Sequence, residues 1–296
     1  MYRSDQRRVR RNLFLSFRVE SRNLSLLIRE MTLDGCAALI TGASAGLGRE
    51  FARRLASRAR ILVLVARRET RLNELRDELL SHNPNLSVRV RVVDLADKSR
   101  IDELIRWLEQ EKIEIDLLIN NAGLGDYGSF ATSDPERDDR ILQVNIVALT
   151  SLTRRLLPQM IARKRGAVLN VSSSAGFLPI PGMAVYAASK AYVNSFSEAL
   201  RGELRGTGVT VAALCPGPVH TEFGDAAKRP GGEPERGPEF VYVSVETTIR
   251  DALAAVEADQ PLVIPGFAMK LGMFLVRLTP MSILRLAWRF TGKRGS

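Results

Sequence analysis

Short apolar runs alternate with longer helical stretches along most of this 296-residue chain. Strands joined by helices pair in parallel, because each helix returns the chain to the edge where the previous strand began, and these crossovers are right-handed. The rhythm therefore predicts a doubly wound α/β fold, with one parallel sheet of about seven strands and helices on both faces. The predicted strands are 36–40, 61–66, 88–93, 115–119, 166–172, 209–215 and 262–264.

Composition and charge divide the chain into three parts. Hydrophobic residues make up 45% of it, enough for one large core. The net charge is +10, but residues 1–30 hold eight arginines against three acids, and residues 260–296 hold six lysines or arginines and no acid. We therefore expect a basic extension over 1–31, a folded domain over 32–266 and a basic tail over 267–296. No nucleic-acid-binding motif accompanies the charge, so no nucleic-acid partner is expected.

The N-terminal extension lacks the apolar core of a secretory signal peptide, because Arg18, Glu20 and Arg22 interrupt its apolar runs. Its arginines and serines leave an organelle transit peptide open as an alternative. The simpler interpretation is a disordered extension, or a start codon placed too early, since Met31 directly precedes the first predicted strand. We expect a cytoplasmic protein.

Two cysteines, Cys36 and Cys215, lie in predicted buried strands. This placement fits reduced thiols in a cytosol, and the sequence shows no disulfide or metal-ligand spacing. No metal site is expected.

The C-terminal tail predicts amphipathic helices interrupted at Thr279-Pro280. Its apolar stretches are shorter than the ~20 residues of a membrane-spanning helix and contain Lys270 and Arg277, so it should not cross a bilayer. It could lie in a membrane interface as a peripheral contact, cover an apolar substrate pocket, contact a second subunit or pack on its own core. The apolar positions are Phe267, Leu271, Phe274, Leu278, Leu284, Ala287 and Trp288, beside Arg285 and Arg289.

A glycine-rich loop follows the first predicted strand. Gly42, Gly46 and Gly48 lie between this strand and a helix predicted from about Gly46. Glycines there allow backbone N–H groups to approach a pyrophosphate, whose charge suits a helix N-terminus. The spacing differs from the general dinucleotide-binding pattern, so the loop alone could be an ordinary strand-to-helix turn.

Tyr186 and Lys190 are four residues apart in an alanine-rich segment, 184–192, that predicts a helix. Side chains at this spacing share a helix face, and a cation beside a phenol lowers the pKa of the phenol from about 10. Lowering it to neutrality needs roughly 4 kcal/mol, so we expect a second positive charge to contribute. By itself such a pair is more often a surface tyrosine packed on a lysine stem.

Further motifs share the order and spacing of one family. They are Asn120-Asn121-Ala122-Gly123, Asn145, Ser173 and Pro216-Gly217, together with the glycine loop and the tyrosine–lysine pair. In this combination residues 33–266 resemble the short-chain dehydrogenases/reductases. The resemblance implies a Rossmann-type fold, a catalytic domain over 32–266 and an oxidoreductase that uses a nicotinamide cofactor.

The resemblance also implies catalytic roles for four residues. Tyr186 would be the acid in carbonyl reduction and the base in alcohol oxidation, and Ser173 would hydrogen-bond the substrate oxygen. Lys190 would hold the nicotinamide ribose and, with the oxidised ring, lower the pKa of the tyrosine. Asn145 would kink its helix and hold a water that links Lys190 to solvent, whereas the simpler alternative is a helix asparagine bonded to local backbone.

A cofactor-binding set follows from the same resemblance. Asp94 would contact the adenine, although it could also cap the following helix, and Thr221 would lie near the carboxamide and phosphates. His220 is not expected to be catalytic, because the tyrosine–lysine pair already supplies the acid. The full set is Gly42, Ser44, Gly46, Leu47, Gly48, Arg67, Arg68, Asp94, Leu95, Asn121, Ala122, Gly123, Tyr186, Lys190, Pro216, Gly217, Val219 and Thr221.

Arg67 and Arg68 follow the second predicted strand, where NAD-dependent enzymes place an acid for the ribose 2′-hydroxyl. A guanidinium attracts a 2′-phosphate, so NADP(H) is the preferred cofactor, with NAD(H) as the alternative. Ala45 occupies the other position where the family has a basic residue, which weakens this interpretation. A solvated helix start is the simpler explanation of the two arginines.

The substrate is the least legible part of the sequence. The segment 227–238 is rich in glycine and proline, which argues for a mobile flap over the substrate. Phe130, Phe177, Leu178 and the tail are candidate walls of an apolar pocket. We expect a carbonyl reductase or alcohol dehydrogenase for an apolar small molecule, in a homodimer or homotetramer by resemblance. The alternatives are an epimerase or dehydratase with the same site, or a non-catalytic nucleotide sensor or membrane-associated scaffold.

Overall fold

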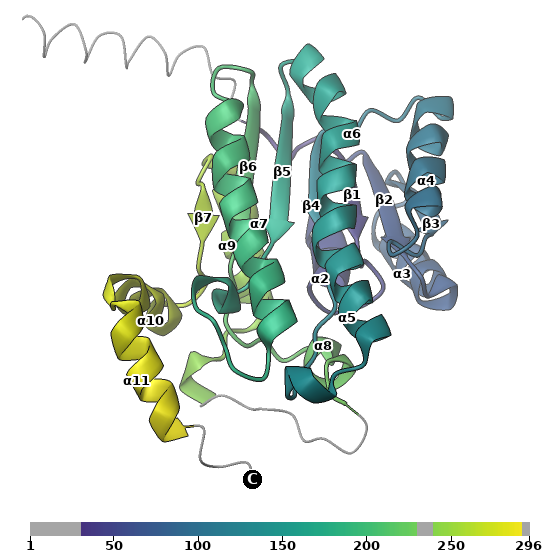
Figure 1. Cartoon of the computed structure of the whole chain (residues 1–296). Helices are drawn as coiled ribbons and strands as arrows, with labels where there is room; N and C mark the ends of the chain where they lie inside the picture. Colours follow the sequence, from purple (N-terminus) through teal and green to yellow (C-terminus); the bar gives the residue numbers. More distant parts are fainter. Residues whose placement is uncertain (1–30, 230–238, 292–296) are drawn as a thin grey trace, which may run out of the picture.

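The computed structural model describes residues 31–229 and 239–291. It holds a seven-stranded parallel sheet in the order β3-β2-β1-β4-β5-β6-β7, with helices on both faces (Figure 1). The predicted doubly wound, Rossmann-type α/β fold is confirmed. The extension over 1–30, most of the flap and the side chains of Ala287, Trp288 and Arg289 lie outside what is described.

The strands end within two residues of their predicted limits, an ordinary difference for element ends. They are β1 (Ala37–Thr41), β2 (Ile61–Ala66), β3 (Ser87–Val92), β4 (Leu117–Asn120), β5 (Gly166–Val171), β6 (Val209–Leu214) and β7 (Leu262–Val263). The α-helices are α2 (Gly46–Leu55), α3 (Glu69–His82), α4 (Lys98–Gln110), α5 (Pro135–Leu142), α6 (Leu149–Ala162), α7 (Ala184–Glu203), α8 (Glu222–Ala226), α9 (Val245–Glu257), α10 (Phe267–Leu278) and α11 (Met281–Thr291). The short helical turns are η1 (Phe130–Thr132), η3 (Ser174–Phe177) and η4 (Glu239–Val241), and η2 (Gln143–Ala148) is a π-helical segment between α5 and α6.

Two hydrophobic layers enclose the sheet. Its inner strands are apolar on both faces, because helices cover both sides and leave no face for water; β5 is buried along its whole length. Helices α2, α3 and α9 cover one face, and α4, α6 and α7 cover the other. Phe51 of α2 and Leu104 of α4 are fully buried, one in each layer.

Strand β3 forms one edge of the sheet and alternates valine with arginine. Val88 and Val90 pack against the layer that contains α2 and α3. Arg91 places its guanidinium 4.5 Å from the centre of the Trp107 ring of α4. Basic side chains on an edge strand disfavour pairing with another chain, so this edge is protected from aggregation.

The two cysteines are buried and unpaired, as predicted. Burial raises the pKa of the Cys36 thiol to about 11 and that of Cys215 to about 12. Both therefore stay protonated, and so unreactive, at neutral pH.

The carboxyl ends of the strands share one edge of the sheet, where β1 and β4 are neighbours although they are not consecutive. The crossovers leave β1 and β4 in opposite directions, so the loops after these strands part and leave a crevice. The fold thus brings the glycine loop, the loop after β4 and the loops after β5 and β6 to one place.

Gly208 and Gly206, just before β6, offer a matched test of backbone packing. Both have a φ of +79°, so alanine at either position costs about 1–2 kcal/mol in backbone strain. A Cβ atom at position 208 would also lie 2.3 Å from the carbonyl oxygen of Lys164, whereas one at 206 would meet nothing within 4 Å. We expect Gly208→Ala to reduce the free energy of unfolding by roughly 1–3 kcal/mol more than Gly206→Ala in urea titrations. Equal losses in the free energy of unfolding would mean that the Lys164 backbone shifts to make room for the Cβ atom at no energetic cost.

Candidate active site

The glycine loop after β1 is packed against the loop after β4. Gly42 and Gly46 have φ values of +67° and +51°, which favour glycine. A Cβ atom on Gly48 would lie 2.3 Å from the Gly42 carbonyl oxygen, so α2 can begin this close to the loop only with glycine there. Asn121 Nδ2 donates to the Thr41 carbonyl oxygen at 2.8 Å and holds the two loops together. A backbone this free of side chains fits the close approach of a dinucleotide pyrophosphate.

Tyr186, Lys190 and Ser173 meet at the amino end of α7. The predicted helix places Tyr186 and Lys190 one turn apart, and both are buried. Ser173, after β5, lies close enough to Tyr186 to lower the pKa of its phenol. Lys190 Nζ lies 5.7 Å from the centre of the Tyr186 ring and donates to the Val171 carbonyl oxygen at 2.8 Å. The structure therefore brings three predicted catalytic side chains together.

Burial is the main influence on the pKa values of Tyr186 and Lys190. It raises the pKa of Tyr186 well above its usual value, and the nearby Ser173 hydroxyl offsets this only in part. Burial also lowers the pKa of Lys190 to about 8. Desolvation is the main influence on the pKa of Tyr186 in the protein without cofactor, so a lowering by Lys190 together with an oxidised nicotinamide ring stays a prediction.

Asn145 lies in the π-helical segment η2, where the helix departs from regular α-helical hydrogen bonding. Its Oδ1 accepts a hydrogen bond from Leu124 N at 2.8 Å, and its Nδ2 donates to the Leu124 carbonyl oxygen at 2.9 Å and to Ser189 Oγ at 3.0 Å. The side chain therefore braces the loop after β4 against α7. The simpler alternative was an asparagine bonded to local backbone. It was wrong, because the backbone that Asn145 binds is 21 residues away in the sequence.

One large pocket joins most of the predicted site. Its volume is about 940 Å³, and Gly48 and Asn145 are the two predicted residues that do not line it, since both are buried behind its wall. The predicted residues that line it are Gly42, Ser44, Gly46, Leu47, Arg67, Arg68, Asp94, Leu95, Asn121, Ala122, Gly123, Ser173, Tyr186, Lys190, Pro216, Gly217, Val219 and Thr221.

The pocket has an apolar end beside Tyr186. The Phe223 ring of α8 lies 5.5 Å from the Tyr186 ring, and Met269 and Met273 of α10 also line the pocket. Leu178 lines this end, as predicted. Two predicted walls were wrong. Phe130 is 65% exposed and faces a smaller hollow, and the Phe177 ring instead lies 5.8 Å from the Arg277 guanidinium.

Arginines gather at the other end of the pocket. Arg67 and Arg68 both line it, and Arg68 Nε donates to Ser44 Oγ of the glycine loop at 3.1 Å. Glu222, at the start of α8, accepts from Arg68 at 2.9 Å and from Arg71 at 2.6 Å. These two guanidiniums hold the pKa of Glu222 below its usual value. A cluster of three cations with one carboxylate suits an anionic group.

Asp94 and His220 both lie on the pocket wall. Asp94 accepts hydrogen bonds from Ala96 N and from Arg140. It is not the cap of the following helix, because Asp97 caps α4 by accepting from Ser99 N. His220 is exposed at the rim, 3.0 Å from a Glu239 oxygen.

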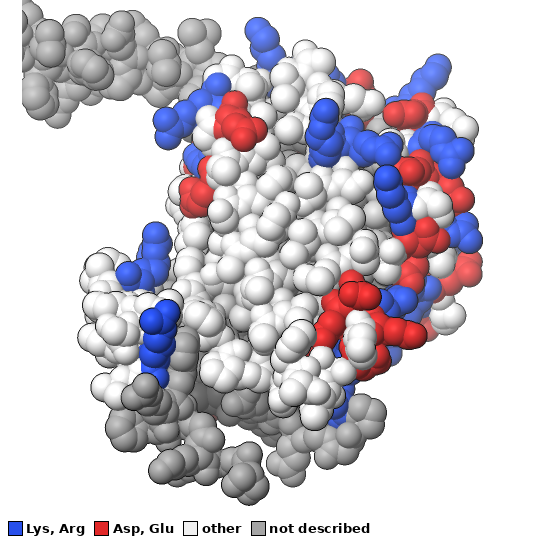
Figure 2. All heavy atoms as spheres, viewed as in Figure 1, with Lys and Arg blue, Asp and Glu red and all other residues white. Residues whose placement is uncertain are grey.

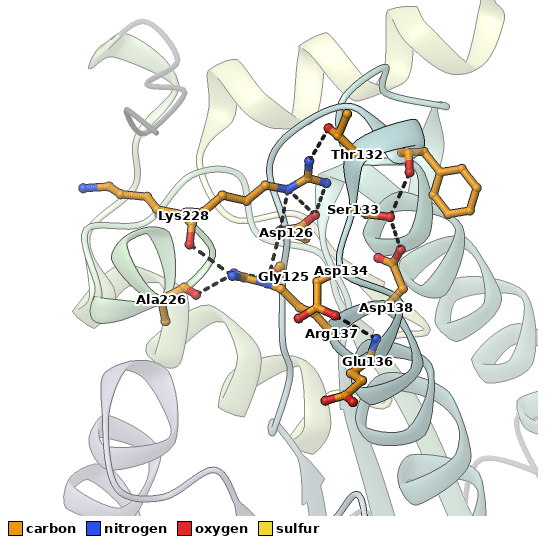
Figure 3. Close-up of polar contacts among 12 residues, drawn as sticks. Gly125, Asp126, Thr132, Ser133, Asp134, Glu136, Arg137, Asp138, Ala226 and Lys228 are labelled. Carbon is orange, nitrogen blue, oxygen red and sulfur yellow. Dashed lines mark hydrogen bonds and ion pairs between the residues drawn. The ribbon is translucent and has the colours of Figure 1, made fainter. Parts of the chain in front are cut away.

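Two arginines hold α8 against the segment after β4 (Figure 3). Arg229 Nε donates to Asp126 at 2.9 Å, and Arg137 Nε lies 3.1 Å from the other oxygen of the same carboxylate. Arg137 also donates to the carbonyl oxygens of Ala226 and Lys228 at the end of α8. Asp126 is almost fully buried, so this cluster fixes the wall that carries Phe223.

Sequence reasoning missed the residues of α8 and the inner face of α10. Glu222 and Phe223 directly follow Thr221, a predicted site residue, and could have been found by extending that motif along the next helix. Met269 and Met273 have helical spacing, but the exposed apolar residues of α10 gave a stronger signal. Arg71 gave no signal, because only the fold brings it to Glu222.

The buried amine gives a pH-dependent prediction. Below pH 8 Lys190 is charged in the folded and unfolded states, and burying that charge costs about 3 kcal/mol, the difference between a folded pKa of about 8 and the usual 10.5. Between these values the unfolded state holds a proton that the folded state has lost, so stability rises with pH. Lys190→Met should therefore be more stable than wild type at pH 7, and its advantage should shrink toward pH 10 in urea titrations.

Lys98→Met is the matched control, because Lys98 is exposed and its substitution relieves no burial. An advantage of Lys190→Met that stayed constant with pH would show that burial of the charge is not its cause.

Comparison with known proteins agrees with this geometry. The family model described as short chain dehydrogenase matches residues 36–230. A short chain dehydrogenase of Pseudocercospora fijiensis is 38% identical over 65% of this chain, and the match spans only 62% of that protein. A very-long-chain 3-oxoacyl-CoA reductase of Anas platyrhynchos is 32% identical over 75% of this chain and 69% of its own.

Solved structures share the fold. A short-chain dehydrogenase from Sphingobium yanoikuyae, in complex with NADPH, superposes with a TM-score of 0.72 at 30% identity, over 88% of this chain and 96% of its own. A short chain dehydrogenase/reductase from Burkholderia phymatum, in complex with NAD, gives a TM-score of 0.72 at 26% identity, over 82% and 93%. The chain belongs to the short-chain dehydrogenases/reductases, a family of nicotinamide-dependent oxidoreductases.

Proposed function

We propose that this protein is an NADP(H)-dependent oxidoreductase that interconverts a carbonyl and a hydroxyl group on an apolar small molecule. The observation that carries the proposal is that Ser173, Tyr186 and buried Lys190 line one pocket, which also has an apolar end. Two hydroxyl groups that converge on one region can meet the oxygen of a carbonyl as it gains negative charge.

The chemistry divides between cofactor and protein. A bound nicotinamide supplies or accepts the hydride. Burial keeps the Tyr186 phenol protonated at neutral pH, which suits a proton donor to a carbonyl oxygen. Ser173 is the second donor. Lys190, fixed by the Val171 carbonyl, keeps its ammonium beside the phenol.

The residues that would hold the cofactor fit a dinucleotide with a 2′-phosphate. The glycine loop leaves backbone free for the pyrophosphate, and a Cβ atom on Gly46 would lie 3.4 Å from Thr221 Cβ, so the cleft is narrow there. Arg67 and Arg68 support NADP(H), and the NADPH in the Sphingobium structure agrees with it. The NAD complex of the Burkholderia protein leaves NAD(H) as the alternative.

The apolar end supports a substrate with hydrocarbon character. Phe223, Met269 and Met273 offer flexible and aromatic surface beside Tyr186. The Anas relative is a 3-oxoacyl-CoA reductase by name, and a similar structure from Comamonas testosteroni is described as an alcohol dehydrogenase specific for bulky ketones. A bulky or long-chain ketone is the substrate class we favour.

An uncharged face on α6 and α7 supports a homo-oligomer. Figure 2 shows this face as a wide area without red or blue atoms. Tyr192 of α7 and Ile161 of α6 are exposed, and Tyr192 stacks on Phe196. We propose that two copies of the chain associate through this face.

Replacing the proposed acid tests the chemistry. Tyr186→Phe should reduce turnover by at least about 100-fold with NADPH and a panel of ketones, aldehydes and quinones, while NADPH affinity changes little. Tyr192→Phe removes the same hydroxyl from a position of the same helix that does not line the pocket and should keep full activity. Unchanged turnover of Tyr186→Phe would refute the assignment. NADPH binding without turnover on any panel member would instead favour the sensor alternative.

Cofactor preference is tested at Arg67. Arg67→Asp should weaken NADPH binding at least about tenfold, because a carboxylate repels the 2′-phosphate, and should leave NADH binding nearly unchanged. Arg205→Asp makes the same change at an exposed arginine outside the pocket and should affect neither cofactor. If the Arg67 variant kept the wild-type ratio of the two affinities, the NADP(H) assignment would be wrong.

A further inference from the structure

Helices α10 and α11 carry an exposed apolar surface at the edge of the molecule, below β7 in Figure 1. Of the fourteen large hydrophobic residues that are exposed in the described chain, eight lie between 267 and 286. We call this surface the tail face. Its residues are Phe267, Leu271, Phe274, Leu275 and Leu278 of α10, and Met281, Ile283 and Leu286 of α11.

Helix α10 is apolar on two opposite sides. Met269 and Met273 point to the pocket. Phe267, Phe274 and Leu278 recur at helical spacing on the other side and are 82%, 59% and 66% exposed. A helix that only roofed the pocket would be polar on its outer side, so the exposed apolar residues of the tail face point to a binding surface.

Charge identifies the kind of partner. Residues 260–296 contain six lysines or arginines and no acid. Lys270 and Arg285 are exposed on these two helices, and neither has an acidic partner within the described residues. Figure 2 shows blue but no red atoms on the tail, whereas acids and bases intermix on the opposite side of the molecule. Aromatic and leucine side chains beside unpaired cations match the interface of an anionic bilayer.

We propose that the tail face docks this protein on an anionic membrane surface. The two helices lie in the interface, because no helix of the described chain is long and apolar enough to cross a bilayer. A second copy of the chain fits the tail face less well, since it would bring the same basic side chains into apposition. Docking through the tail face would leave Met269 and Met273, on the opposite side of α10, facing the pocket.

The test measures cosedimentation of the full-length protein with lipid vesicles, so its outcome does not depend on turnover. Vesicles of phosphatidylcholine and phosphatidylserine in equal amounts should bind the protein, with affinity that falls as salt rises. Vesicles of phosphatidylcholine alone should bind it far more weakly. Equal binding to both, or binding to neither, would overturn the proposal.

Matched variants locate the surface. Phe274→Asp should weaken vesicle binding at least tenfold, whereas Phe130→Asp, at a phenylalanine of similar exposure far along the chain, should not change it. Lys270→Gln with Arg285→Gln should weaken vesicle binding about 25-fold, at about fivefold per charge, and Arg205→Gln with Arg250→Gln should change it little. Thermal unfolding checks that each variant folds.

Two results would overturn the proposal. The first is equal effects of the Phe274 and Phe130 variants on vesicle binding. The second is a wild-type protein that ignores anionic vesicles but loses a subunit from its assembly on Phe274→Asp, measured by analytical ultracentrifugation, which would make the tail face an interface between copies.

Discussion

A buried ammonium without a carboxylate partner is the interaction on which the site depends. In the described part of the chain, Lys190 Nζ bonds only to the Val171 carbonyl oxygen. Burying such a charge is unfavourable, so the surroundings must hold it in place. A Cβ atom on Gly176 would lie 2.7 Å from the Lys190 carbonyl oxygen, and Ser172 Oγ donates to that same oxygen. This tight contact between the segment after β5 and α7 keeps the amine beside Tyr186.

Helix α8 connects the two ends of the pocket. At its start Glu222 pairs with Arg68 and Arg71, at the arginine-rich end. At its end the backbone is held by Arg137, which shares Asp126 with Arg229. The five-residue helix is too short to be stable alone, so these ion pairs define its position. The substrate wall and the proposed 2′-phosphate site are therefore mechanically linked.

Helix α10 shows that the periodicity of apolar residues does not predict which face of a helix is buried. Phe267, Phe274 and Leu278 predict an apolar helix face, and such a face is normally buried. The structure buries the opposite side, with Met269 against Gly217. Helical spacing identifies which residues share a face but contains no information about which face meets the body of the protein. The exposed stripe is therefore a property of the tertiary structure.

Apolar runs, glycines and four-residue spacings are local signals, so the parallel sheet, the glycine loop and the helix that pairs Tyr186 with Lys190 could be predicted from the residues alone. The fold decided what depends on distant contacts. It placed Asn145 against Leu124, Glu222 between two arginines, and Phe130 outside the pocket that the sequence assigned to it. It also set the protonation of Tyr186, because a pKa depends on desolvation by residues from many elements, which no local pattern encodes.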